Sequence, residues 1–184
     1  MFTGVIRHFG KVEAISKKKL GLIVPKSWSG IKTGSSIAVN GVCLTVAGKR
    51  ADRFDFDLAG ETLKRTTLGQ LNLGQRVHLE RPLTWKGRVD GHFVLGHVDG
   101  TGRVRRIDEK KGQKTLLISF PKALKRAIRQ KGSIAVDGVS LTVGRVSAGG
   151  FFVHLIPHTL KLTCFGSLTT GSRVNLETDI LLKR

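Results

Sequence analysis

The segment at residues 36–46, SIAVNGVCLTV, recurs 97 residues later as SIAVDGVSLTV at residues 133–143. Two of the eleven positions differ, because Asn40 is replaced by Asp137 and Cys43 by Ser140. The same offset continues downstream, where residues 54–80 align without a gap on residues 151–177. This repeat is much longer than the unit of a solenoid protein. The sequence therefore predicts two copies of one small domain, which we place at residues 1–88 and 89–184.

Length and charge limit the kind of protein that this sequence encodes. The 184 residues allow two domains of about 90 residues, each small but able to bury a core. The formal net charge is +19, yet the basic residues are scattered along the whole length, and there are two Trp and no Tyr for base stacking. We therefore interpret the charge as solvated surface. A polyanionic partner is the alternative, and nucleic-acid binding is disfavoured.

The cysteines and the N-terminus predict the cellular compartment. Cys43 and Cys164 form neither a disulfide framework nor a metal-ligand pattern, and reduced thiols suit the cytoplasm. The N-terminus lacks the basic stretch and apolar run of a signal peptide. No apolar stretch is long enough to cross a membrane. We therefore predict a soluble cytoplasmic protein without a membrane partner.

Short apolar or alternating runs bounded by glycine are typical of β-strands. Such runs occur at residues 4–15, 20–24, 36–46, 53–58 and 75–79, and again at 96–107, 115–120, 133–143, 151–155 and 172–176. About six short strands of even spacing in each copy favour a closed barrel over an open sheet. Short helices are expected at residues 25–31, 61–68, 121–131 and 158–165. The predicted fold is all-β: two tandem pseudo-symmetric six-stranded closed β-barrels with short helices.

The repeated segment carries a reactive type of side chain in each copy. Side chains alternate along a strand, so Cys43 and Thr45 point to one face, as do Ser140 and Thr142. The close duplication of the surrounding pattern favours a chemical role for this face. The structural alternative makes Cys43 a small buried hydrophobe and Ser140 a hydrogen-bonded hydroxyl.

Two histidines flank a glycine in the segment DGHFVLGHVDG at residues 90–100. The spacing of His92 and His97 is not that of a zinc site, and no cysteine or third histidine lies nearby in the sequence, so we predict no metal. Histidine titrates near neutral pH and is suited to acid–base catalysis. Structural histidines in a glycine-rich junction are the alternative. Motifs for phosphate binding and for a hydrolase nucleophile are absent.

Five motifs together resemble the riboflavin synthase family over nearly the whole chain. They are residues 1–4 (MFTG), 40–46 (NGVCLTV), 91–100 (GHFVLGHVDG), 137–143 (DGVSLTV) and 155–160 (LIPHTL). The resemblance implies two barrels that each bind one 6,7-dimethyl-8-ribityllumazine. One molecule donates a four-carbon unit to the other, giving riboflavin and 5-amino-6-ribitylamino-uracil without a metal or organic cofactor. Two similar pockets suit a reaction between two copies of one substrate.

The resemblance also implies roles for the residues that match the family's motifs. Ser140 stands at the key hydroxyl of the C-terminal barrel, which bonds the lumazine and steers formation of the reactive anion. Cys43 stands at the equivalent thiol of the N-terminal barrel and orients or activates the acceptor. His97 and His92 are candidates for proton transfer at the acidic methyl group on carbon 7. The implied substrate-binding positions are Gly4, Val5, Ile6, Ser36, Leu44, Thr45, Gly60, Glu61, Thr62, Gly96, Val98, Lys131, Leu141, Thr142, Ile156, Pro157, His158 and Thr159.

Three features depart from the family's pattern. The family continues past the last strand into a C-terminal helix that gathers subunits into a trimer, whereas this sequence stops at Arg184. The family's active site lies between two subunits, so a homo-oligomer is expected. Without that helix, a monomer or an oligomer built in another way is the alternative. Asp90 stands where a glycine is common. The high positive charge is not needed for the reaction and suggests docking to an acidic partner, for instance a lumazine synthase shell.

The alternative function is a non-catalytic lumazine- or flavin-binding carrier on the same fold. Such relatives typically lose the reactive groups of one barrel. Cys43, His97 and Ser140 are all present in this sequence, within their motifs. The sequence therefore favours the enzyme over the carrier.

Overall fold

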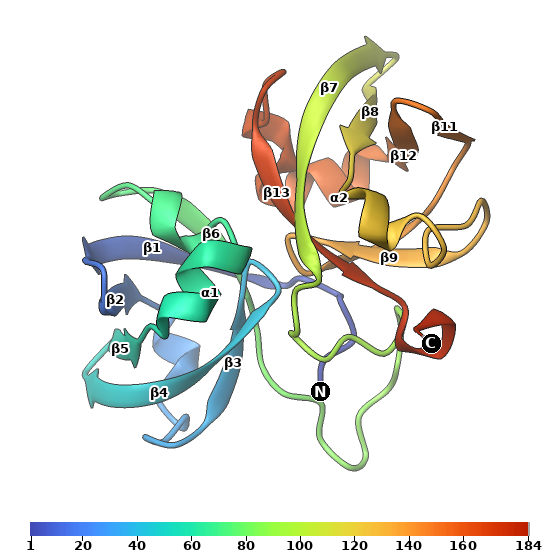
Figure 1. Cartoon of the computed structure of the whole chain (residues 1–184). Helices are drawn as coiled ribbons and strands as arrows, with labels where there is room; N and C mark the ends of the chain where they lie inside the picture. The colour runs from blue at the N-terminus through green and yellow to red at the C-terminus, as the bar shows by residue number, and fades with distance from the viewer. Residues whose placement is uncertain (184) are drawn as a thin grey trace.

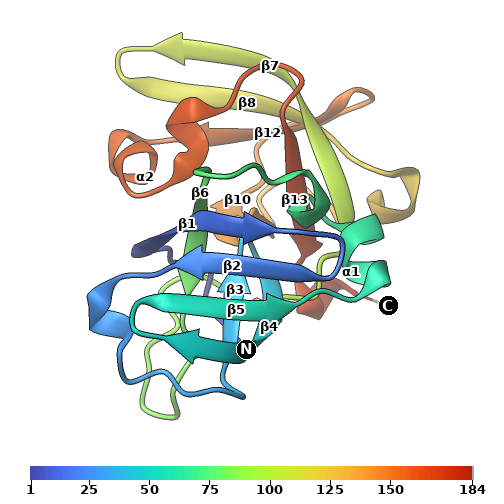
Figure 2. The same cartoon turned by 90° about the vertical axis from the view of Figure 1, so that its left-hand side faces the viewer.

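The computed structural model describes residues 1–183 and contains two β-rich lobes joined by an extended segment (Figures 1 and 2). The first lobe is a closed antiparallel barrel with strand order β1–β2–β5–β4–β3–β6. Its strands are β1 (His8–Ile15), β2 (Lys19–Ile23), β3 (Ser36–Val39), β4 (Val42–Arg50), β5 (Arg53–Asp57) and β6 (Arg76–Glu80). Each strand pairs on both sides, so the barrel has no open edge.

The second lobe has seven strands in the order β10–β9–β13–β7–β8–β12–β11. They are β7 (Gly100–Lys110), β8 (Gln113–Ser119), β9 (Ser133–Val136), β10 (Val139–Thr142), β11 (Val146–Ser147), β12 (Gly150–Leu155) and β13 (Arg173–Thr178). The two end strands, β10 and β11, are consecutive pieces of the path that β4 takes in the first lobe. Hydrogen bonds from Gly144 N to Phe152 O (2.7 Å) and from Phe152 N to Arg145 O (2.9 Å) continue that path between them. The prediction of two tandem barrels is confirmed, with one strand of the second barrel interrupted.

Each copy of the repeated segment is a hairpin, so the expectation of one continuous strand was wrong. Asn40 and Gly41 have φ angles of 44° and 76°, and Asp137 and Gly138 have φ angles of 44° and 78°. Two successive residues with positive φ form the tight turn that matches the twist of a β-hairpin, and Asn-Gly is its strongest sequence signal. Apolar residues continue on both sides of this turn, and such a run is typical of one continuous strand.

The helices are short. They are α1 (Gly60–Arg65) and α2 (Pro157–Lys161), with the 3₁₀ turns η1 (Lys26–Trp28), η2 (Leu68–Gln70), η3 (Lys122–Leu124), η4 (Cys164–Ser167) and η5 (Ile180–Leu182). The helix expected at residues 121–131 shrinks to η3. Leu124 and Ile128 pack on the core of the second barrel, but most other side chains of the segment are exposed. A helix of eleven residues with so narrow an apolar face is too short to be stable by itself. No helix within residues 1–183 is long and apolar enough to span a membrane.

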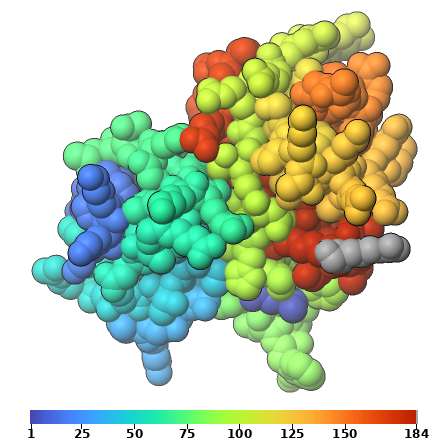
Figure 3. Space-filling model, in the orientation of Figure 1, coloured from blue at the N-terminus to red at the C-terminus, as the bar shows by residue number. Residues whose placement is uncertain are grey.

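The segments that lead into the two barrels, residues 1–7 and 90–99, are exchanged between them, and we call them the entry segments. Ile6, which precedes β1, is buried in the core of the second barrel, and Val98, which precedes β7, packs against the core of the first. Phe2 and Val94 pair as an antiparallel bridge and form a third buried cluster with Ala38 and Ala135. In Figure 3 the dark-blue N-terminal atoms lie beside light-green atoms of the segment that joins the barrels. The two lobes are therefore interlocked rather than simply adjacent.

Candidate active site

Ser140 lies on β10 at the contact between its barrel and the N-terminal segment. Its backbone N–H donates to the carbonyl oxygen of Gly4 (2.8 Å). Its hydroxyl oxygen lies 2.7 Å from Nδ1 of His92. Gly4 has φ 74°, and a Cβ atom there would lie 2.7 Å from Cβ of Ser140, so this approach requires glycine. The fold thus pairs a half-buried hydroxyl with an imidazole.

Cys43 occupies the equivalent place on β4 of the first barrel. Its backbone N–H donates to the carbonyl oxygen of Gly96 (2.9 Å), as that of Ser140 does to Gly4. Gly96 has φ 79°, and a Cβ atom there would lie 2.6 Å from Cβ of Cys43. The half-buried thiol also packs against the third buried cluster. Each reactive side chain therefore contacts the entry segment of the other barrel.

The two histidines of the 90–100 segment differ in their surroundings. His92 is buried, and within residues 1–183 its Nε2 has no hydrogen-bond partner. Burial lowers the pKa of its imidazole, which favours the neutral form that can accept a proton. His97 is exposed, and no hydrogen bond joins it to Cys43 or Ser140 in the described part of the chain. The structure brings His92, and not His97, to Ser140.

Several predicted substrate-binding residues face each other across the hairpins. Ser36 pairs with Thr45 across β3 and β4, in the way that Ser133 pairs with Thr142 across β9 and β10. Both threonines are exposed. Lys131 is also exposed, with φ 69°, and its N–H donates to the carbonyl oxygen of Val143 (2.8 Å), next to that hairpin.

The other predicted positions fall into three groups. Gly60, Glu61 and Thr62 begin α1, and Ile156 to Thr159 cover the start of α2. Val5 follows Gly4 and is half-buried. Ile6 and Leu44 are buried in barrel cores, whereas Leu141 and Val98 are partly buried against them. Within the described residues, no group of three or more His, Cys, Asp or Glu is arranged to hold a metal ion.

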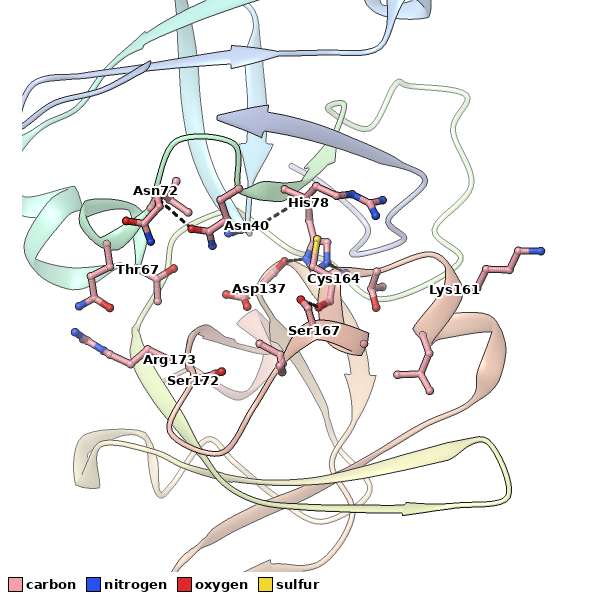
Figure 4. Close-up of a pocket in the computed structure, with 18 residues that line it drawn as sticks. Asn40, Thr67, Asn72, His78, Asp137, Lys161, Cys164, Ser167, Ser172 and Arg173 are labelled. Atoms are coloured by element: carbon pink, nitrogen blue, oxygen red, sulfur yellow. Dashed lines mark hydrogen bonds between the residues drawn. The ribbon is translucent and has the colours of Figure 1, made fainter. Parts of the chain in front are cut away.

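A polar groove of about 780 Å³ lies between the barrels, and Figure 4 shows the side chains that line it. At its centre each turn of the repeated segment accepts a hydrogen bond from a neighbouring strand. Oδ1 of Asn40 accepts from the N–H of His78 (2.8 Å), and Oδ1 of Asp137 accepts from the N–H of Asn175 (2.7 Å). Neither His78 nor Asn175 is among the residues predicted from the sequence. The sequence offered one signal for them, because His78 and Asn175 occupy equivalent positions of the repeat in β6 and β13.

The same two side chains also reach across to the opposite barrel. Nε2 of His78 accepts from the N–H of Cys164 (2.6 Å), so its proton is on Nδ1, which donates to the carbonyl oxygen of Asp137 (2.8 Å). The amide of Asn175 copies this pattern: Oδ1 accepts from the N–H of Thr67 (2.8 Å), and Nδ2 donates to the carbonyl oxygen of Asn40 (2.9 Å). Burial lowers the pKa of His78 to about 4, which keeps it neutral, and raises the pKa of Asp137 to about 7.

Similarities to known proteins agree with this two-barrel arrangement. A family model described as the lumazine binding domain matches residues 3–82 and again residues 95–179. The riboflavin synthase of Actinobacillus pleuropneumoniae is 44% identical over all of this chain and 87% of the relative. That of Escherichia coli is 37% identical over 97% of this chain and 87% of the relative. The chain belongs to the riboflavin synthase family. The resemblance inferred from its motifs is confirmed, and so is the prediction of a riboflavin synthase enzyme.

Solved structures of LumP share the fold. LumP complexed with riboflavin superposes with a TM-score of 0.90, at 28% identity over 97% of this chain and 99% of the LumP chain. LumP complexed with 6,7-dimethyl-8-(1'-D-ribityl) lumazine superposes with a TM-score of 0.88. Riboflavin synthase family membership therefore agrees with both the sequence and the three-dimensional arrangement of the two repeats.

Proposed function

We propose that this chain catalyses the dismutation of two 6,7-dimethyl-8-ribityllumazine molecules. A four-carbon unit passes from one molecule to the other, and the products are riboflavin and 5-amino-6-ribitylamino-uracil. The observation that carries this proposal is the equivalence of Cys43 and Ser140. Each lies on the second strand of its hairpin and donates its N–H to a glycine carbonyl, that of Gly96 or Gly4. Two matched positions suit two molecules of one substrate, held so that the bound rings can react.

Within this proposal Ser140 and Cys43 divide the work of the two sites. The hydroxyl of Ser140 bonds one lumazine and favours its anionic form, and the thiol of Cys43 orients the acceptor. His92 supports Ser140, because its Nδ1 lies 2.7 Å from the hydroxyl oxygen. His97 accepts or donates protons at the methyl group on carbon 7, and its exposure suits contact with a substrate held partly by another subunit.

The remaining predicted residues line the pockets in the same proposal. Thr45, Thr142 and Lys131 are exposed and Ser36 is half-buried, and these residues would contact the ring and the ribityl chain. We further propose a cytoplasmic homo-oligomer whose active site forms between barrels of neighbouring subunits. We also propose that the protein associates with a lumazine synthase shell. The proposed domains are residues 1–88 and 89–184.

A turnover assay tests the proposed reaction. Purified protein is incubated with 6,7-dimethyl-8-ribityllumazine, and riboflavin formation is followed by its absorbance. Ser140→Ala and His97→Ala are each expected to slow turnover by about 100-fold or more, the usual contribution of a hydrogen-bond donor to an anion and of a positioned acid–base group, respectively. The matched controls are Ser147→Ala and His154→Ala, which replace exposed residues of the same barrel and should remain near the parent rate. Parent-like rates in both test variants would remove the assigned roles.

The second candidate function is a non-catalytic carrier of lumazines or flavins. The close superposition with LumP bound to riboflavin favours this candidate, since LumP has the same two-barrel fold. The same incubation separates the two functions. Tight ligand binding without formation of riboflavin would reject the enzyme and support the carrier.

A further inference from the structure

Two buried glutamates occupy equivalent places in the two barrels. Glu80 ends β6 and Glu177 lies in β13, 97 residues apart, and their exposed fractions are 9% and 3%. Neither forms an ion pair within residues 1–183. A buried carboxylate without a cation needs several hydrogen-bond donors to compensate for its lost hydration. The donors that each one receives belong to the entry segments of the barrels.

Glu80 holds the segment that contacts Ser140. Its Oε1 accepts from the N–H of Thr3 (2.7 Å) and from the hydroxyl of Thr3 (2.8 Å), and its Oε2 accepts from the N–H of Gly4 (3.0 Å). The carbonyl of Gly4 in turn accepts from the N–H of Ser140 (2.8 Å). A carboxylate on a strand of the first barrel is thus connected, through one glycine, to the reactive side chain of the second barrel.

Glu177 makes the reverse connection. Its Oε1 accepts from the N–H of Leu95 (2.7 Å), and its Oε2 accepts from the N–H of Gly96 (2.9 Å). The carbonyl of Gly96 accepts from the N–H of Cys43 (2.9 Å). A carboxylate on a strand of the second barrel is therefore connected to the reactive side chain of the first.

We propose that Glu80 and Glu177 are crossed positioning residues, each of which holds the reactive side chain of the other barrel in place. In each barrel two neighbouring N–H groups reach the two different oxygens of one side chain, which suits a carboxylate because both of its oxygens are acceptors. A glutamine at the same place has one acceptor oxygen and turns its NH₂ group toward one of the two N–H groups. Either the glycine or the residue before it then loses its hydrogen bond to the side chain, and the backbone beside the reactive side chain loosens.

The reactivity of thiols tests this crossing without any use of turnover. In a Cys164→Ser background, Cys43 is labelled with 5,5′-dithiobis(2-nitrobenzoate) under native conditions. Glu177→Gln is expected to speed labelling about tenfold, the factor that corresponds to ~1.4 kcal/mol, a typical buried hydrogen bond. Glu80→Gln, although it lies in the same barrel as Cys43, is expected to leave the labelling rate within about twofold of the parent.

The reciprocal experiment moves the reporter to the other barrel. In a Cys43→Ser, Cys164→Ser background, Ser140→Cys introduces the repeat's own alternative side chain as the labelled thiol. Glu80→Gln should now speed labelling, and Glu177→Gln should not. Glu109→Gln, at an exposed glutamate of β7, is the matched control and should change neither rate. The crossed pattern distinguishes positioning from general loosening, which speeds both labels together.

Two outcomes would overturn the inference. One is equal acceleration of both thiols by either variant, and the other is acceleration only within the glutamate's own barrel. If Glu80→Gln does not fold, Thr3→Val removes the hydroxyl that donates to Oε1 of Glu80 and that accepts a long hydrogen bond from the N–H of Val5 (3.4 Å), and it should still act on the Ser140 side alone. The inference rests on the proposed function only for the expectation that both glutamine variants slow turnover. A crossed labelling pattern in a parent protein that makes no riboflavin would leave the positioning intact and reject the reaction.

Discussion

Asp137→Asn is expected to stabilise the protein above neutral pH. The carboxyl group of Asp137 is buried, accepts the N–H of Asn175 through Oδ1, and has no ion-pair partner within residues 1–183. Burial raises its pKa from 3.8 to about 7. Asparagine already serves the same turn in the other barrel, where Asn40 has the same φ of 44° and accepts the N–H of His78 through Oδ1. The substitution therefore keeps the hydrogen bond and removes the titrating group.

The sign and size of the effect follow from the two pKa values. A carboxyl group whose pKa is higher in the folded state than in the unfolded state favours folding fully below pH 3.8. This contribution disappears as the pH rises through about 7. The interval of about three pH units corresponds to roughly 4 kcal/mol. Between pH 5 and pH 8 the free energy of unfolding of Asp137→Asn, relative to the parent, should increase by about 2 to 3 kcal/mol.

Urea denaturation of parent and variant at pH 5 and pH 8 measures this difference. The comparison cancels the titration of His78, which both proteins share. Asn40→Asp is the reciprocal control, because it places a second carboxyl group at the equivalent turn and should destabilise the protein more at pH 8 than at pH 5. A stability difference between Asp137→Asn and the parent that is the same at both pH values would refute the reasoning.

Two further substitutions test the contact between the barrels. His78→Asn should retain both cross-barrel bonds, as Asn175 does. The parent is expected to lose stability as the pH falls from 6.5 through about 4, because its buried imidazole must then take up a proton, and the variant should lack this loss. The free energy of unfolding of the variant, relative to the parent, should therefore rise by about 3 kcal/mol between pH 7 and pH 4, and parallel pH curves would contradict this expectation. Gly41→Ala places a Cβ atom 2.5 Å from the N of Gly138, at a φ of +76°, and should destabilise the protein by about 3 kcal/mol in thermal melts. The control is Gly60→Ala, where a Cβ atom meets no other atom within 4 Å, and it should change stability by less than about 1 kcal/mol. Similar melting temperatures for the two variants would count against this interpretation.

The sequence predicted the barrels because their signals are local and duplicated. Each strand shows its own apolar alternation, and the second copy repeats the first with the same spacing. The turn at Asn40 and Gly41 was also readable, since Asn-Gly is a hairpin signal, but the long apolar run around it suggested a single strand. The helix expected at residues 121–131 was wrong beyond η3, because Leu124 and Ile128 pack on the core but most other side chains of the segment are exposed, which is too little packing to stabilise a full helix.

The candidate site was predictable in its residue types and not in its contacts. Cys43 and Ser140 differ within a segment that is otherwise almost identical in the two copies, and this difference identified both positions directly. The pairing of Ser140 with His92 was not predictable, because the two residues lie 48 positions apart and on different elements. His97 carries an equal sequence signal and makes no such contact. Spacing alone does not distinguish the two histidines.

The sequence by itself determined that the chain has two barrels and one reactive position in each, because a repeat and its alternation pattern are properties of the linear order. Only the tertiary structure decided which barrel supports which reactive side chain. An alignment pairs Gly4 with Gly96 and Glu80 with Glu177, but it does not say that the entry segments are exchanged. The exchange arises because Ile6 and Val98 bury their side chains in the opposite cores, and the backbone beside them is then satisfied by donors and acceptors from both barrels.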